Sequence, residues 1–206
     1  MIKFFAVTIF GILLSCSSPE TNSNETRNES KPQPTVAVAD TISLDLPPGA
    51  VRQKYEGNDG LENVTVTDNQ GNTIVQGTLM NGKKVGSWVE FNTNGSAKKI
   101  TSYVNGKKEG WLIELNSTGQ FTKKVLYRNN LRHGPYMGYN YTTLKEERFY
   151  QNDKLEGSVK LYYDNGKVME EGNYVNGTRE GVSKWYDQNG NKTIEYTYNK
   201  GELVKN

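Results

Sequence analysis

The chain has 206 residues, with 25 Lys and Arg against 23 Asp and Glu, and a formal charge of +2. A single His and a single Cys are too few for most His-based catalysis, disulfide frameworks or Cys/His zinc sites. The nearly balanced charge argues against a dedicated nucleic-acid-binding protein, and the 11% aromatic residues argue against a fully disordered chain. The length suggests one or two domains.

Residues 1–16, MIKFFAVTIFGILLSC, place one cation, Lys3, before an apolar run that ends at Leu14. That run is shorter than the ~20 residues needed to span a bilayer and has the size of a signal-peptide core. Its end, Leu13-Leu14-Ser15-Cys16, resembles the lipobox of bacterial lipoproteins. The resemblance implies a signal peptide over 1–15, lipid attachment at Cys16 and a lipid anchor in the cell envelope. By resemblance to enterobacterial sorting rules, Ser17 after the lipid site implies the outer membrane. The alternative is an ordinary signal peptide with an incidental Cys.

Residues 17–48 show no apolar periodicity and are rich in Ser, Asn, Thr, Glu and Pro. This composition is typical of a flexible, solvated segment. We therefore expect residues 16–48 to be a lipidated Cys followed by a tether, and residues 49–206 to hold the folded domain.

The folded region repeats with a period of about 24 residues. A recurring glycine closes a segment of the form NGKKxG, at spacings of 24, 24, 23 and 24 residues: Gly86, Gly110, Gly134, Gly157 and Gly181. An aromatic column keeps the same register: Tyr103, Tyr127, Tyr150, Tyr174 and Tyr198. Fixed periods in this range indicate stacked repeats. We place the units near 71–94, 95–118, 119–142, 143–165 and 166–189, with a partial unit at 190–206.

Each unit has two turn signals separated by short segments rich in Trp, Tyr, Val, Ile and Thr. One is the NGKKxG segment, and the other is an Asn-Gly pair at 94–95, 165–166 or 189–190. Asn-Gly favours type I′ hairpins, so we expect type I′ turns at both places. The sequence therefore predicts an all-β fold, an elongated antiparallel meander with two strands per unit. Val64–Thr67 and Ile194–Val204 are expected to be partial units that cap its ends.

The two faces of this sheet are harder to assign. Trp88 and Phe91 are three residues apart, which strict alternation places on opposite faces. Either a β-bulge lies between them or both faces carry aromatic residues. We favour a twisted single-layer sheet with one better-covered face.

The segments GSWVEFNTNG, GWLIELNSTG, KLYYDNG and KWYDQNG, each after an NGKKxG-like turn, resemble the bacterial MORN repeat variant. The third unit departs most, with Asn130 and Thr143 in place of the two turn glycines. The resemblance implies a general interaction module. Some bacterial proteins with these repeats are described as YwqK-family antitoxins, so a cognate toxin is one expected partner. Cell-wall-binding repeats, which are shorter, are a second resemblance.

Candidate catalytic residues are few. Glu90 and Glu114 recur because the repeat recurs, and Asp164 and Asp187 precede hairpin glycines. His133 falls in a turn column shared with glutamates, where a solvated role is expected. We therefore expect no catalytic residues, no metal site, no cofactor and no enzymatic activity.

The turns also carry cations, which we expect to form a basic rim along one edge of the sheet: Lys83, Lys84, Lys107, Lys108, Arg132, Lys154 and Arg179. Such a rim could contact anionic lipid headgroups, lipopolysaccharide or an acidic protein, or could serve solubility alone. The tyrosine column is expected mainly to pack.

The sequence thus predicts a non-enzymatic, membrane-anchored envelope lipoprotein. Its repeat sheet would bind a protein or an envelope polymer, or would serve as a structural scaffold. An antitoxin or immunity protein is the first alternative, and a cell-wall or glycan-binding module is the second.

Overall fold

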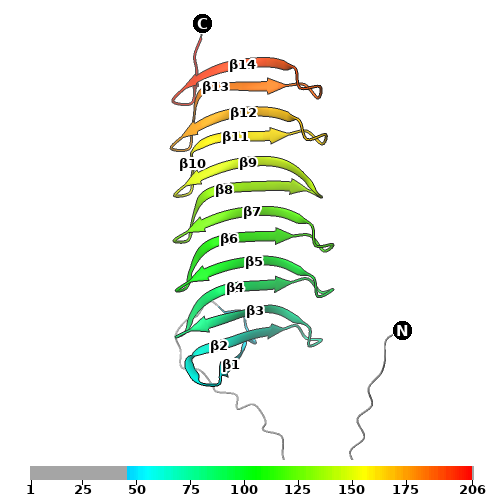
Figure 1. Cartoon of the computed structure of the whole chain (residues 1–206), viewed down its shortest axis with the longest axis vertical. Helices are drawn as coiled ribbons and strands as arrows, with labels where there is room; N and C mark the ends of the chain where they lie inside the picture. Colours follow the sequence, from blue (N-terminus) through cyan, green and yellow to red (C-terminus); the bar gives the residue numbers. More distant parts are fainter. Residues whose placement is uncertain (1–45, 206) are drawn as a thin grey trace, which may run out of the picture. The chain divides into compact units, whose positions relative to one another are not determined.

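The structure, a computed structural model, describes residues 46–205, so the predicted signal peptide, Cys16 and nearly all of the tether lie outside the described residues. The described chain forms one sheet of 15 antiparallel strands and no helix (Figure 1). This confirms the predicted all-β meander. Within this part of the chain there is no helix long and apolar enough to span a membrane.

The strands follow one another across the sheet in chain order, except that the short β10 pairs only with β9. Their bounds are β1 (Val51–Tyr55), β2 (Asn58–Thr67), β3 (Thr73–Met80), β4 (Lys83–Phe91), β5 (Ala97–Val104), β6 (Lys107–Leu115), β7 (Phe121–Arg128), β8 (Leu131–Asn140), β9 (Thr143–Gln151), β10 (Lys154–Leu155), β11 (Gly157–Tyr162), β12 (Val168–Val175), β13 (Thr178–Tyr186), β14 (Lys192–Asn199) and β15 (Glu202–Leu203).

Two-residue turns line the left edge of the sheet in Figure 1. In the turn between β3 and β4, Asn81 and Gly82 have φ values of 49° and 73°. Two consecutive positive φ values are what a type I′ turn requires. The prediction is confirmed here, and the same pattern recurs at Asn105-Gly106, Asn129-Asn130, Asn152-Asp153, Asn176-Gly177 and Lys200-Gly201.

The type I′ prediction is wrong for the longer turns on the right edge. In the turn after β4 only Gly95 has a positive φ, and its amide donates to the carbonyl of Asn92 at 2.9 Å. This is a turn closed by one left-handed glycine. A side-chain cap explains the difference: in the last such turn, Asp187 accepts from the amides of Asn189 and Asn191 at 2.9 and 2.8 Å.

The interval from Gly134 to Gly157 is one residue shorter than the others because the turn within it is tighter. Asn140 pairs with Thr143, so only Tyr141 and Thr142 form the turn. Tyr141 takes a left-handed φ of 54° with its side chain 71% exposed. This turn accounts for the single 23-residue spacing in the glycine column.

The recurring glycine, predicted to close the two-residue turn, lies inside the following strand. Gln76 pairs with Val89 and Thr78 with Val85, so Gly86 falls within a bulge of β4, where it has a φ of 64°. The equivalent glycines also have positive φ and lie in or beside irregular pairing: Gly110, Gly134, Gly157 and Gly181. The glycines therefore set bulges, which increase the local twist.

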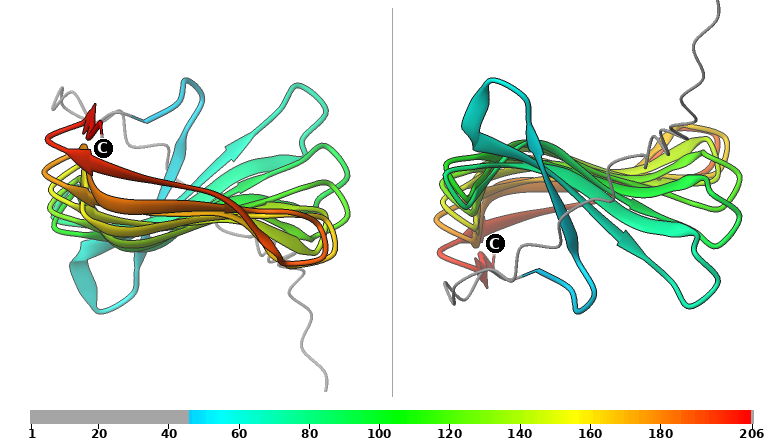
Figure 2. Two further views of the ribbon diagram at one scale, coloured as in Figure 1. Left: turned by 90° about the horizontal axis from the view of Figure 1, so that it is seen from above. Right: turned by 90° about the horizontal axis from the view of Figure 1, so that it is seen from below.

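The sheet is a twisted single layer, and its two ends are rotated relative to each other in the end-on views (Figure 2). The register places every buried hydrophobic side chain on one face, which we call the packed face: Val64, Val66, Leu79, Trp88, Leu112, Val125 and Tyr150. Leu46 and Ala50 pack against the Val64–Leu79–Trp88 cluster at the N-terminal end of this face. We call the opposite side the open face.

Of the two explanations offered for Trp88 and Phe91, the second is correct. The register of β4 and β5 does shift between Glu90 and Phe91, but the extra residue lies in β5, between Ala97 and Lys99, so alternation along β4 is kept. Trp88 lies on the packed face, whereas Tyr162, which is equivalent to Phe91, donates to Glu147 on the open face. Both faces therefore carry aromatic side chains.

The N-terminal end of the sheet is larger than predicted. Instead of a partial unit at Val64–Thr67, β2 runs from Asn58 to Thr67 and β1 precedes it. At the C-terminal end β15 pairs with only two residues of β14, Tyr198 and Asn199.

Candidate binding surface

The predicted tyrosine column lies on the packed face, where cations cover its rings. The Lys108 ammonium lies 5.1 Å from the Tyr127 ring centre, and the Arg132 guanidinium lies 4.1 Å from that of Tyr150. Arg179 lies 5.3 Å from both Tyr174 and Tyr198. Lys84 is placed likewise between Trp88 and Tyr103, at 4.7 and 5.4 Å. These contacts are worth about 0.5–1 kcal/mol each at partly exposed sites, so the column is engaged in packing.

The predicted basic rim is therefore divided between the two faces. The cations at the second Lys position of the NGKKxG segment lie over aromatic rings on the packed face: Lys84, Lys108, Arg132 and Arg179. Lys83, Lys107 and Lys154 stay exposed at the turn edge. Adjacent strand residues point to opposite faces, so no two-lysine turn can present both charges on one surface.

The glutamates near this edge are occupied in joining neighbouring turns. Glu109 accepts from the amide of Asn129, and Glu156 from that of Asn176, both at 2.8 Å. Glu180 does the same for Lys200 at 2.7 Å. His133 holds the equivalent position in the third unit, where its Nδ1 lies 3.3 Å from Oδ1 of Asn152. Sequence reasoning placed His133 in this column but missed the turn-capping role of its neighbours.

The candidate carboxylates also have partners. Glu90 pairs with Lys99, and Glu114 with Lys123 at 2.6 Å, across neighbouring strands of the packed face. A hydrogen bond from the Asn191 side chain, followed by backbone amides, lowers the pKa of Asp187. Asp164 pairs with Lys145. Among the described residues, no cluster of three or more His, Cys, Asp and Glu side chains could hold a metal ion.

One row of directly paired residues on the open face changes from mostly apolar to charged halfway across the sheet. Successive strands contribute directly paired residues to this row: Gln76, Val89, Ile100, Ile113, Lys124, Met137, Glu147, Lys160, Glu171, Lys184 and Glu195. Up to β8 most of its members are apolar, and from β9 onward they alternate in charge. Opposite charges placed side by side stabilise a sheet, so the second half is a solvated strand ladder.

The packed face changes in the opposite sense. Its corresponding row is charged over β4–β9, where Glu–Lys pairs cross it, and becomes more apolar afterwards, with Leu161, Trp185 and Ile194. The two faces therefore exchange apolar character near β9. Sequence periodicity could not reveal this exchange, because strands such as β4 carry large apolar residues on both faces, as Trp88 and Val89 do.

The apolar part of the open face forms a continuous surface over β4–β9. We call it the apolar patch, and its members are Val89, Ile100, Trp111, Ile113, Leu126, Pro135, Met137 and Phe149. Phe149 is 45% exposed, and the other members of the patch are half-buried. Contiguous exposed apolar surface of this kind marks interaction sites in soluble domains.

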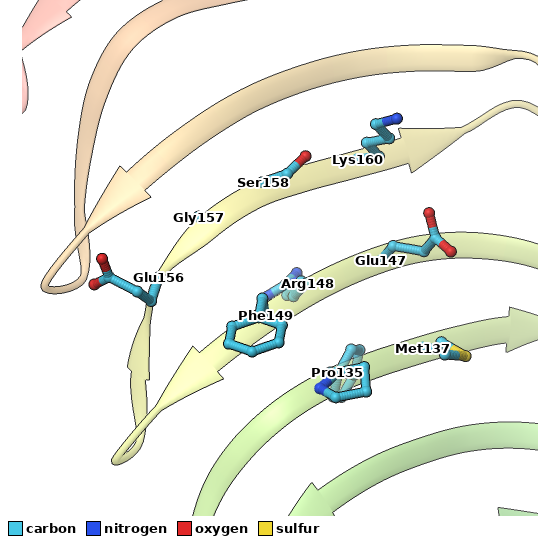
Figure 3. A pocket seen from close by; sticks show the side chains of 10 residues that line it. Pro135, Met137, Glu147, Arg148, Phe149, Glu156, Gly157, Ser158 and Lys160 are labelled. Atoms are coloured by element: carbon cyan, nitrogen blue, oxygen red, sulfur yellow. The ribbon is translucent and has the colours of Figure 1, made fainter.

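A pocket of about 540 Å³ lies at one end of the apolar patch (Figure 3). Pro135, Met137 and Phe149 contribute its apolar lining from β8 and β9, and Ser158 and Lys160 border it from β11. The pocket forms where β9 and β11 share only two paired positions, Lys160↔Glu147 and Leu161↔Glu146.

Two phenols on β8 and β11, near this pocket, have raised pKa values. Burial, followed by a hydrogen bond to Glu147, raises the pKa of the Tyr162 phenol. Burial, followed by Glu146, raises the pKa of Tyr136 to about 12. Both phenols stay protonated at neutral pH.

Residues 155–176 and 179–200 match the MORN repeat variant. The first matched segment contains β11 and β12, and the second contains β14 and all of β13 but its first residue. Earlier in the chain, β4–β9 show the same order of two-residue turn, bulge and second turn. No curated protein matches the chain. A MORN repeat variant is thus present in residues 155–200, and the described chain is a repeat sheet suited to binding or to a structural scaffold.

Proposed function

We propose that this protein is a non-enzymatic, lipid-anchored protein of the bacterial cell envelope, whose repeat sheet presents a binding surface to a protein or polymer partner. The surface of the sheet supports the proposal that the protein binds a partner. The lipobox-like Leu13–Cys16 and the polar tether support the proposal that it is lipid-anchored.

The apolar patch is the observation that favours binding. Large apolar side chains on the open face have no second layer above them among the described residues, although the packed face holds every buried hydrophobic side chain. Burying such side chains against a partner stabilises a complex by roughly 25 cal/mol per Å² of apolar area before the costs of association.

The absence of an enzymatic role is part of the same proposal. The carboxylates that recur in the sequence are taken up by ion pairs, as in Glu114–Lys123, or by turn amides, as in Glu109 and Glu156. Because these carboxylates already accept from donors within the sheet, their arrangement suits structural roles better than proton transfer.

The anchoring is tested by growing cells with radiolabelled palmitate and separating their membranes. We expect the wild-type chain to carry the label and to sediment with the outer membrane, and Cys16→Ser to lose both properties. An unlabelled wild-type chain, or a labelled Cys16→Ser variant, would reject the lipid anchor.

The alternatives predict different results in deletion and sedimentation experiments. An immunity protein would become essential only in the presence of one co-encoded toxin. A glycan-binding module would sediment with purified peptidoglycan through its sheet, with no protein partner. The first result would contradict the proposed function, whereas the second would restrict its partner to a wall polymer.

A further inference from the structure

We infer that the apolar patch, together with the cations around it, is a docking surface for an acidic, amphipathic segment of a protein partner. The inference rests on the proposed scaffold function and narrows it to one face, one half of the sheet and one partner chemistry. The pocket beside Phe149 is the anchor point of this surface.

The distribution of exposed apolar side chains indicates that a partner docks on the open face. On the packed face of β2–β9 the strand-to-strand contacts, the cation-covered tyrosines and the Leu46–Ala50 segment already use the large apolar groups. The large apolar side chains that this face leaves exposed, Ile194 and Tyr196, lie on β14. On the open face of β4–β9 the apolar row is uncovered, and Phe149 and Leu131 are 45% and 40% exposed. A partner therefore gains the most apolar burial on this side.

The cations on the open face favour an acidic partner. The register places Lys83, Lys98, Lys107, Lys124, Arg128 and Lys145 on the open face of these strands. The carboxylates there, Glu109 and Glu147, and Glu156 at the edge of the pocket, already accept internal hydrogen bonds, and Lys145 already pairs with Asp164. In the described part of the chain, no ion pair joins Lys83, Lys98 or Arg128 to a carboxylate.

An excess of unpaired cations around an apolar centre complements a segment with acidic residues flanking apolar ones. Lys124 reinforces this preference, because its ammonium lies over the Trp111 and Phe121 rings, 5.2 and 5.4 Å from their centres, within the patch itself. A basic segment would place like charges against Lys98, Lys107 and Arg128. Such repulsion disfavours that class of partner.

The pocket supplies the anchor. Its lining from Pro135, Met137 and Phe149 is apolar, and its volume of about 540 Å³ can receive a bulky aliphatic or aromatic side chain (Figure 3). Interfaces concentrate their binding energy on a few such anchors in pockets, surrounded by polar contacts.

The test replaces Phe149 in the full-length chain with the photo-cross-linker benzoylphenylalanine and irradiates living cells. Tyr196 provides the matched control, because it is equally exposed at 45% but lies on the packed face of β14. Cross-linked peptides are identified by mass spectrometry. We expect position 149 to capture a protein segment of net negative charge with apolar residues, and position 196 not to capture it.

A triple charge reversal, Lys98→Glu, Lys107→Glu and Arg128→Glu, should lower the yield of that adduct at least about tenfold. Raising the ionic strength to about 1 M, where the screening length falls to about 3 Å, should lower it as well. The three side chains are exposed, and circular dichroism of the variant checks that the sheet still forms.

Adducts from 149 to a basic segment, to lipid or to glycan would overturn the inference, as would an adduct insensitive to the charge reversal. Protein adducts from 196 but none from 149 would also overturn it and leave the scaffold function standing. The absence of any adduct from both positions and from further outward positions along the sheet would reject the scaffold function as well.

Discussion

At the scale of single residues, Tyr141 is the clearest departure from what its backbone position prefers. It has a φ of 54° in the two-residue turn between β8 and β9. A bulky L-residue in the left-handed region costs about 1–2 kcal/mol, whereas Asn tolerates it. The side chain is mostly exposed, so its packing does not repay this cost.

We therefore expect Tyr141→Asn to raise the free energy of unfolding by about 1 kcal/mol, measured by urea denaturation. Gly95→Ala, in a longer turn, should act in the opposite direction because Gly95 has a φ of 80°. A destabilised Tyr141→Asn variant would show that the Tyr141 ring makes contacts that outweigh its backbone strain.

His133 is a second residue whose replacement is expected to stabilise the protein. In three other units the equivalent glutamate accepts the amide of the next turn, as Glu109 does from Asn129 at 2.8 Å. We expect His133→Glu to provide the same bond to the Asn152 amide and to stabilise the protein by about 0.5–1 kcal/mol. An unchanged or lower melting temperature, with His133→Gln as the uncharged control, would contradict this role.

At the scale of the elements, neighbouring two-residue turns are joined to one another. Asp153 accepts from the backbone amide of Arg132 at 2.9 Å and from its Nε at 2.8 Å. These hydrogen bonds, the side-chain one first, hold the pKa of Asp153 below its usual value. A carboxyl with a depressed folded-state pKa stabilises the fold above its unfolded pKa, and this stabilisation is lost as the pH falls through the folded value.

The stability difference between wild type and Asp153→Asn should therefore be present at neutral pH and shrink between about pH 5 and pH 2. Urea unfolding at a series of pH values measures it, and Asn keeps the left-handed turn, as Asn130 does in the preceding unit. A difference that does not change with pH would show that the Asp153 charge contributes nothing.

Substitution of two glycines without positive φ values, Gly77 and Gly172, tests how closely the side chains of neighbouring strands pack. A Cβ on Gly77 would lie 2.2 Å from the buried Trp88 ring, whereas one on Gly172 would lie 2.8 Å from the Ser183 hydroxyl. We expect Gly77→Ala to cost about 1–3 kcal/mol, because the ring has no room to move. Gly172→Ala should cost less because a hydroxyl can rotate. Equal losses would mean that the Trp88 ring is not fixed above Gly77.

The elements show where sequence reasoning succeeds and fails. Asn-Gly at 81–82 predicted its turn correctly, because two positive φ values suit those residues. The same dipeptide failed at 94–95, where the Asn94 side chain accepts from the Ser96 amide, and at 189–190, where Asp187 caps the turn. The Gly86 column was recognised as periodic, but a glycine in a bulge and a glycine in a turn look alike in sequence.

At the scale of the whole sheet, the repeat period predicted the meander but not the division of the two faces. The exchange near β9 depends on which of two adjacent apolar residues faces which side, and strands such as β4 offer both, in Trp88 and Val89. Bulges at each glycine then change the register locally. The candidate surface therefore emerged only once the strand pairs were known.

In this sheet the stability of each repeat depends mainly on its nearest neighbours. Each strand pairs only with its neighbours in chain order, apart from the β9–β11 step around β10. In such an arrangement, stability is approximately a sum over units and the interfaces between them. A unit removed in register should leave the remaining strands able to pair.

Deletion of residues 105–128, one 24-residue unit, tests this most directly. It joins Val104 to Asn129 and lets Tyr103 face Arg132 as it now faces Lys108. We expect the shortened chain to unfold cooperatively in urea with a β-sheet circular dichroism spectrum and reduced stability, whereas deletion of residues 105–116 alone should abolish folding. An unfolded 105–128 deletion would contradict the account of a sheet built from neighbouring repeats.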